Sequence, residues 1–311
     1  MGMSQSSSPL RIGTRGSALA LVQANMVRDA LAARGQACEI VPLKTTGDRI
    51  TDRPLADIGG KGLFTKELED ALLAERIDLA VHSMKDVPVD LPDGLTIAAI
   101  LPREDARDVF ISHKARTLAE LPKSARVGTS SVRRQAQVLR ARPDVEIVSL
   151  RGNVDTRLRK LESGDYDAII LALAGLKRLG LADRATTILS LDEWLPALSQ
   201  GAVGIEARDD DARAIEAVRP LDDRPTSIAL GCERAFQSAL DGSCRSPIGG
   251  HASFESGTLN FRGEVIAPDG TGFGSASFEQ KLGANPLREA EALGREAGLD
   301  LKPRVIDWLA R

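Results

Sequence analysis

The chain has 311 residues, of which 42% are hydrophobic and 27% are charged, a balance typical of a soluble globular protein with two or three domains. The net charge is -3 and aromatic residues make up 3%, so neither an overall basic field nor a set of base-stacking rings favours nucleic acid. No apolar run approaches the roughly 18 residues that span a membrane. The Ser-rich start, residues 1–9, lacks the apolar core of a signal peptide. We therefore expect no nucleic-acid or membrane partner.

Cysteine usage indicates the compartment. Cys38, Cys232 and Cys244 are an odd number without metal-binding spacing, which favours a reducing environment and no metal site. We therefore expect a cytoplasmic protein. Charge is also unevenly distributed, because residues 126–160 hold nine Lys or Arg against three Asp or Glu.

Residues 10–101 alternate strand patterns with helix patterns. In chain order we expect strand 10–14, helix 17–34, strand 39–44, helix 65–74, strand 78–82 and strand 95–101. A Gly-rich stretch, residues 58–64, precedes the second helix. It lacks the spacing of a phosphate-binding loop, so a mobile lid is the better interpretation.

Residues 106–196 show the same alternation of strand and helix patterns. The expected strands and helices are strands 109–113, 126–128, 145–150 and 168–172, and helices 131–141 and 155–163. Both blocks open alike, with Ile12-Gly13-Thr14 and Val127-Gly128-Thr129, and each opening leads to a helix that contains Gln-Ala. Strand-helix alternation predicts parallel sheets with right-handed crossovers, so we expect two related α/β lobes.

The remaining chain returns to the first lobe and then changes character. A strand followed by a helix over 202–219 would give two connections between the lobes and a cleft between them. Beyond residue 224 the pattern is helix 227–240, strands 252–254, 258–266 and 274–281, and a helical region 286–311. The predicted domains are a first lobe (9–101 and 202–219), a second lobe (106–196) and a small C-terminal α+β domain (224–311).

Three strand-to-helix junctions carry arginine. They place Arg15, the pair Arg133 and Arg134, and Arg151 at predicted helix starts, and Arg157 lies one turn farther on. Helix N-termini attract anions, and guanidinium groups pair with carboxylate or phosphate. A single arginine is most simply solvated, but the shared position of these five predicts a ligand with several negative groups.

Two further residues are candidates for chemistry. Cys244 lies in a Gly- and Pro-containing loop beside Arg245, which favours the thiolate, although an ordinary loop cysteine is an alternative. Asp86 directly follows a predicted strand, where the ligand crevice of an open α/β sheet lies. Its carboxylate could stabilise a cation or move a proton, or it could cap a helix or pair with Lys85.

Together the segments of this chain resemble the porphobilinogen deaminase (hydroxymethylbilane synthase) family. The resemblance covers residues 15–20, 59–67, 81–88, 128–134, 151–158, 172–180, 200–206 and 242–249. It implies two lobes like those of periplasmic binding proteins, separated by a cleft, and a small third domain. It also implies a monomeric transferase of heme and tetrapyrrole biosynthesis that joins four porphobilinogen molecules head to tail, with loss of ammonia, and releases hydroxymethylbilane by hydrolysis.

The resemblance also assigns residues. A dipyrromethane cofactor, used as a primer, would be attached by a thioether to Cys244, and Asp86 would be the catalytic aspartate. Residues implied to bind the carboxylates of cofactor and substrate are Arg15, Ser17, Lys85, Thr129, Ser131, Arg133, Arg134, Arg151, Arg157, Arg178 and Gln200. Lys61 and Phe64 would belong to the lid.

Two other classes fit part of the pattern. A two-lobed binding module for a polycarboxylate metabolite would explain the arginines but leaves Cys244 and the third domain unexplained. A hydrolase is disfavoured because no base is paired with Cys244 in the sequence. Denaturation separates these classes, since a binding module releases its ligand and the synthase retains a covalently bound pyrrole.

Overall fold

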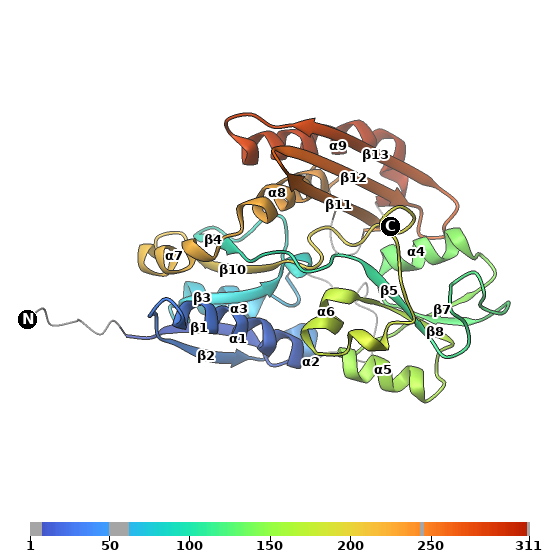
Figure 1. The fold of residues 1–311 in the computed structure, drawn as a ribbon, viewed down its shortest axis with the longest axis horizontal. Helices are drawn as coiled ribbons and strands as arrows, with labels where there is room; N and C mark the ends of the chain where they lie inside the picture. Colours follow the sequence, from blue (N-terminus) through green and yellow to red (C-terminus); the bar gives the residue numbers. More distant parts are fainter. Residues whose placement is uncertain (1–7, 50–61, 243–245, 310–311) are drawn as a thin grey trace, which may run out of the picture.

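The structure, a computed structural model, describes residues 8–49, 62–242 and 246–309. Within them the chain forms two five-stranded sheets and one three-stranded sheet. Figure 1 shows the two larger sheets in neighbouring lobes, with the three-stranded sheet and its helices packed on one side of both. The predicted class, two α/β lobes with a C-terminal α+β unit, is confirmed.

The first lobe is a mixed sheet with strand order β2-β1-β3-β10-β4. Its strands are β1 (Leu10–Arg15), β2 (Cys38–Leu43), β3 (Leu79–Ser83), β4 (Leu95–Ile100) and β10 (Val203–Arg208). Its helical segments are α1 (Ala18–Ala32), α2 (Thr46–Arg49), α3 (Lys66–Leu73), the short 3-10 helix η2 (Met84–Asp86), α7 (Ala212–Val218) and η4 (Arg219–Leu221). Strands β1, β2 and β3 are parallel, whereas β10 is antiparallel to both of its neighbours.

The second lobe has strand order β7-β6-β8-β5-β9. Its strands are β5 (Asp108–Ser112), β6 (Arg126–Gly128), β7 (Glu146–Val148), β8 (Ala168–Ala172) and β9 (Thr187–Ile188). Its helical segments are α4 (Val132–Ala141), α5 (Val154–Glu162), α6 (Leu173–Arg178) and η3 (Ala182–Arg184). Here β5 is the antiparallel strand, next to β8 and β9.

The two sheets therefore share one topology. In each, the first parallel strand lies between the second and the third, and the strand that arrives from the other lobe inserts antiparallel beside the third. The matching openings at Gly13 and Gly128 lie on equivalent strands, β1 and β6. The prediction of related lobes is confirmed by this arrangement.

The two chain segments that connect the lobes touch each other. Gly201 has φ +91°, and a Cβ atom built on it would lie 2.3 Å from the carbonyl oxygen of Glu104. The Glu104 N–H in turn donates to the Gly201 carbonyl at 3.2 Å. Both the left-handed backbone and the close approach require glycine at this crossing.

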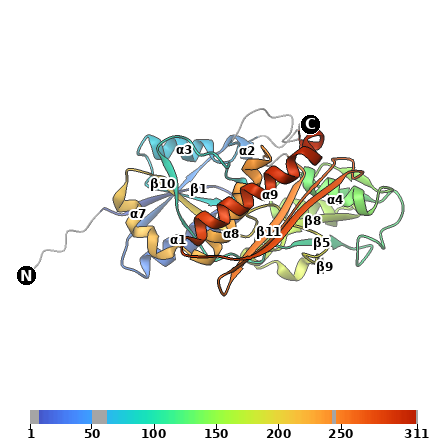
Figure 2. The same cartoon turned by 90° about the horizontal axis from the view of Figure 1, so that it is seen from above.

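The C-terminal unit packs two helices against its own sheet. It comprises α8 (Arg224–Ala239), β11 (Ile248–Glu255), β12 (Thr258–Ile266), β13 (Phe273–Lys281) and α9 (Pro286–Leu309), and Figure 2 shows α9 running along this unit. Gly294 and Gly298 of α9 face the backbone of α8, where an added Cβ would lie 2.2 Å from the Cys232 oxygen and 2.8 Å from the Phe236 oxygen. Because glycine has no side chain, α8 and α9 can approach each other closely at these two positions.

A buried ion pair joins this unit to the connecting segments. Arg103 donates to both carboxylate oxygens of Glu233 on α8, at 2.6 and 3.2 Å. The Glu233 carboxylate also accepts N–H groups from Ser199 and Ala252 and is fully buried. Four donors therefore compensate the buried charge.

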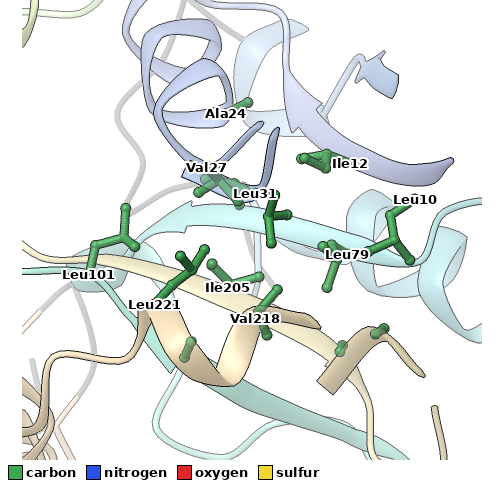
Figure 3. Packing of buried hydrophobic residues seen from close by; sticks show 14 of the residues in the cluster. Leu10, Ile12, Ala24, Val27, Leu31, Leu79, Leu101, Ile205, Val218 and Leu221 are labelled. Atoms are coloured by element: carbon green, nitrogen blue, oxygen red, sulfur yellow. The ribbon is translucent and has the colours of Figure 1, made fainter. Parts of the chain in front are cut away.

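The first lobe has a continuous apolar core, shown in Figure 3. Leu10 and Ile12 of β1 pack with Val27 and Leu31 of α1, and Ile205 of β10 completes the layer. Full burial of one such side chain contributes about 1.5–3 kcal/mol relative to exposure. This core holds the ends of β1 and β3 in fixed positions at the cleft.

Candidate active site

A cavity of about 190 Å³ lies between the lobes. Five cationic side chains line it: Arg15, Lys85, Arg134, Arg157 and Arg178. Ser17 and Gln200, two other residues expected at the site, are also among its lining residues. Seven of the predicted binding residues, from both lobes, therefore meet at one cavity.

The first lobe supplies Arg15 from the last position of β1, and Ser17 caps the following helix by accepting the Ala20 N–H at 3.3 Å. The Arg15 guanidinium carbon lies 4.2 Å from the centre of the Phe64 ring. Its Nη1 lies 4.0 Å from an oxygen of Asp86. The predicted catalytic carboxylate is thus next to the cavity, at the carboxyl end of β3.

Lys85 precedes Asp86, and its side chain reaches the segment around Gln200 that returns from the second lobe to the first. Its ammonium donates to Gln200 Oε1 at 3.2 Å. Burial and the nearby Arg134 lower the pKa of Lys85 from 10.5 to about 8, although Asp86 and Asp108 oppose this shift. The lysine is therefore still mostly protonated at neutral pH and able to bind an anion.

Asp108, the first residue of β5, organises the second lobe's side of the cavity. It is fully buried, and its pKa lies well below the usual range because Arg133, Arg134 and Gln200 compensate for burial. Arg134 donates to both carboxylate oxygens, at 3.1 and 2.7 Å. Gln200 donates to Oδ1 at 2.8 Å, and Trp194 donates to Oδ2 at 3.0 Å. One carboxylate thus fixes two of the residues that line the cavity.

Arg133 is not brought to this cavity. It is 4% exposed and donates to Asp108 at 2.9 Å, to the Leu195 carbonyl at 2.9 Å and to Gln137 at 2.8 Å. Because neighbouring positions of an α-helix point about 100° apart, only Arg134 of the pair faces the cavity. In this structure Arg133 supports Asp108 and takes no place among the lining residues.

Arg157 and Arg178 are partly buried cationic residues of the cavity wall. Burial, with Arg134 and Arg151 nearby, lowers the pKa of Arg157 to about 10, and its Nε donates to the Gly152 carbonyl at 2.8 Å. Arg178 donates from Nη2 to the Gly201 carbonyl at 2.6 Å. Its Nε is buried and has no hydrogen-bond partner within the described ranges. An anionic ligand in the cavity could accept a hydrogen bond from this group.

Three other predicted residues, Thr129, Ser131 and Arg151, do not line the cavity. Thr129 is buried and accepts the Ser131 N–H at 3.1 Å, and Ser131 caps α4 by accepting the Arg134 N–H at 3.4 Å. Arg151 is partly buried, which lowers its pKa, and it is close enough to Arg157 to lower the pKa of that residue. None of the three is among the residues that line the cavity.

Two predicted residues, Cys244 and Lys61, lie outside the described residues. Among the residues that are described, no group of three or more His, Cys, Asp or Glu could hold a metal ion. Within the same part of the chain, no helix is long and apolar enough to cross a lipid bilayer.

Sequence reasoning missed four polar residues of this region. Asp108 stands at the start of an apolar strand, which was the available signal, but its partners are remote in sequence. Gln23 and Ser83 line the cavity and bond to each other at 2.9 Å. Asp155, on the first turn of α5, also lines it.

Comparisons with known proteins identify the family of this chain. Residues 10–216 match the family model described as porphobilinogen deaminase, dipyromethane cofactor binding domain, and residues 228–303 match that of the porphobilinogen deaminase C-terminal domain. A solved periplasmic substrate-binding protein of an ABC transporter from Coxiella burnetii shares 15% identity, with 70% of this chain and 93% of that chain covered and a TM-score of 0.45.

Curated relatives are similar over most of their length. Porphobilinogen deaminase of Nitrobacter hamburgensis is 56% identical, with 94% of this chain and 93% of the relative covered. The chloroplastic enzyme of Oryza sativa subsp. japonica is 51% identical (95% and 84% covered), and that of Paracoccus denitrificans is 50% identical (96% and 97% covered). This chain therefore belongs to the porphobilinogen deaminase family, transferases of tetrapyrrole biosynthesis that carry a dipyrromethane cofactor.

Proposed function

We propose that the cavity between the lobes is where this transferase condenses four porphobilinogen molecules head to tail, with loss of ammonia, before hydroxymethylbilane is released by hydrolysis. The observation that carries this proposal is the set of five cationic side chains around one cavity beside Asp86. Each porphobilinogen brings an acetate and a propionate, so a chain of such units needs many cationic partners.

The described residues fit a bound dipyrromethane. Its carboxylates match Arg157 and the buried, unpartnered Nε of Arg178. Arg15, Lys85 and Arg134 would supply the other charge-assisted bonds, and Arg151 adds positive charge near Arg157. When bound through a thioether to Cys244, dipyrromethane supplies the primer pyrrole for the reaction.

Asp86 is the proposed catalytic residue. Loss of ammonia from porphobilinogen leaves positive charge on the pyrrole, and a carboxylate held beside it stabilises that charge. Arg15, whose Nη1 lies 4.0 Å away, and the neighbouring Lys85 place positive charge beside this carboxylate. A carboxylate there also accepts pyrrole N–H groups and fixes the ring that reacts.

Gln200 and Arg134 are proposed as orienting groups. Both are fixed by Asp108, and Gln200 in turn holds the Lys85 ammonium at 3.2 Å. Because these hydrogen-bond donors are already held in position, they rearrange little when carboxylates bind, which lowers the entropic cost of binding. Phe64 is proposed as part of the lid, since it stacks on Arg15, and Ser17, Thr129 and Ser131 as neutral donors near the helix starts.

We further propose a monomeric, cytoplasmic enzyme whose domains are 9–101 with 202–219, 106–196, and 224–311. The family resemblance supports the monomer, and the cysteine pattern supports the reducing compartment. Sedimentation velocity at micromolar concentration tests the first point, with a single species near 33.2 kDa expected.

The function is tested by stoichiometry. Purified protein incubated with porphobilinogen should release four molecules of ammonia for each linear tetrapyrrole formed, with both products measured in the same reaction. A polycarboxylate-binding module, the alternative, would bind porphobilinogen reversibly and release no ammonia.

A further inference from the structure

Asp155 places a negative charge in a cavity whose other charged lining residues are all cationic. Among the described residues that line this cavity, it alone carries a carboxylate. It occupies the first turn of α5 and is exposed. No ion pair or hydrogen bond to its side chain is found within the described ranges, although Arg157 lies two residues farther along the same helix.

Asp86 does not fill the same role. It adjoins the cavity without being among its lining residues, it lies 4.0 Å from Arg15, and its proposed role is toward the pyrrole ring. Asp155 makes no direct ion pair within the described ranges, and its negative charge partly opposes the attraction of the five cationic side chains for entering carboxylates. A positive group on the ligand would turn this cost into an attraction.

Porphobilinogen carries one such group. Besides its acetate and propionate it has an aminomethyl group, which is protonated near neutral pH and leaves as ammonia in the reaction. Pyrrole units that have already reacted lack this amine and carry only carboxylates. A carboxylate on the cavity wall therefore distinguishes a fresh substrate molecule from a unit that has already been incorporated.

We propose that Asp155 is a specificity-determining residue that binds the ammonium group of incoming porphobilinogen. This inference rests on the proposed function. Its ion pair with the substrate is lost together with ammonia, and repulsion from the carboxylates of the reacted unit remains. Asp155 thus favours loading of the monomer and disfavours retention of reacted units at the same position.

If Asp155 served only to stabilise its helix, its replacement would affect ligand binding differently. As a first-turn acid, Asp155 also stabilises the N-terminus of α5 through the helix dipole. Loss of that contribution would weaken the binding of all ligands together, because Arg157 sits on the same helix. Opposite effects on two ligands that differ only in the amine exclude this explanation.

The test compares Asp155→Asn with wild type and with Asp165→Asn, an exposed acid beyond the other end of α5. We would measure KM for porphobilinogen. We would also measure, by calorimetry, Kd for a pyrrole that bears the same acetate and propionate but a methyl group in place of the aminomethyl. Both measurements use the cofactor-loaded enzyme.

Asp155→Asn should raise KM for porphobilinogen about 2- to 5-fold, as expected for one exposed charged pair, and should lower Kd for the methyl analogue. Asp165→Asn should leave both values unchanged. An unchanged or lower KM in Asp155→Asn, or parallel weakening of both ligands, overturns the inference. Absence of ammonia release by wild type overturns instead the proposed function on which it rests.

Discussion

Arg134 meets Asp108 side-on, with Nε and Nη2 donating to the two carboxylate oxygens at 3.1 and 2.7 Å. This bidentate geometry fixes the plane of the guanidinium, and a third nitrogen, Nη1, donates to the Ile170 carbonyl at 2.9 Å. Arg134 is thus immobilised before any ligand arrives. The fold thus fixes this one of the five positive charges that line the cavity.

Asp108→Asn should therefore be strongly destabilising. It leaves Arg133 and Arg134 buried without their shared counter-charge, and breaking a buried ion pair from one side costs about 3–5 kcal/mol. We expect a large drop in the midpoint of urea unfolding. Asp105→Asn, which removes a partly exposed pair with Arg107, should cost about 1 kcal/mol or less. Equal effects of the two variants would contradict the role of Asp108.

Gly201→Ala should destabilise the crossing between the lobes. The new Cβ would lie 2.3 Å from the Glu104 oxygen at a backbone φ of +91°. Gly180→Ala is a matched control, since Gly180 has φ +69° but nothing within 4 Å. We expect the control to cost about 1–2 kcal/mol from its backbone conformation, and Gly201→Ala to cost about 1–3 kcal/mol more from the contact. Equal unfolding midpoints for Gly201→Ala and Gly180→Ala would show that the backbone around Gly201 and Glu104 can shift to accommodate the added Cβ, and would contradict the prediction.

Lys85 should become reactive at lower pH than an exposed lysine, since its pKa is about 8 rather than 10.5. Amine acylation of the cofactor-free variant Cys244→Ser, followed by peptide mass mapping, measures this. Modification of Lys85 should rise through pH 8, whereas Lys66, an exposed residue of α3, serves as the internal control. Identical pH profiles for the two lysines would contradict the assignment.

The lowered pKa of Lys85 predicts opposite effects of rising pH on protein stability and on carboxylate affinity. Between pH 8 and 10.5 the unfolded chain holds a proton on Lys85 that the folded chain has lost, so this residue's contribution to stability becomes more favourable as pH rises. Over the same range the folded protein loses a positive charge, so affinity for carboxylates should fall. Titration of a dicarboxylate pyrrole into Cys244→Ser at pH 7 and pH 9.5 checks the second effect, and equal affinities would argue against Lys85 as a binding residue.

Asp86→Asn should leave a folded, cofactor-loaded protein with little turnover. The amide keeps the size of the side chain but lacks the charge that stabilises the electron-poor pyrrole. Single-turnover kinetics with porphobilinogen, together with the intact mass of the variant, separate chemistry from loading. Turnover close to wild type in a fully loaded variant would refute the catalytic role.

The sequence predicted the lobes because strand and helix periodicities are local. The arrangement Ile12-Gly13-Thr14 and its counterpart Val127-Gly128-Thr129 identified equivalent strands of two sheets with one topology. Strand β11 was expected over 252–254 but begins at Ile248, because Gly249 and Gly250 interrupt the apolar pattern. Those glycines allow close packing, since a Cβ on Gly250 would lie 2.5 Å from Leu198.

The site was predictable only in part. Arginines at helix starts signalled an anionic ligand, and most of them line the cavity. Which member of the Arg133 and Arg134 pair faces the cavity depends on the position of Asp108, 25 residues away from Arg133 in the chain. The contact of Phe64 with Arg15 depends likewise on packing between segments distant in sequence. Such long-range pairings have no local signature.

The intact denatured mass of wild type and of Cys244→Ser tests the central claim, a covalently attached pyrrole primer, most directly. We predict a wild-type mass that exceeds the polypeptide by two linked pyrrole units, and a Cys244→Ser mass without this excess. A bare polypeptide mass for wild type after incubation with porphobilinogen, or an excess that persists in Cys244→Ser, would contradict the account.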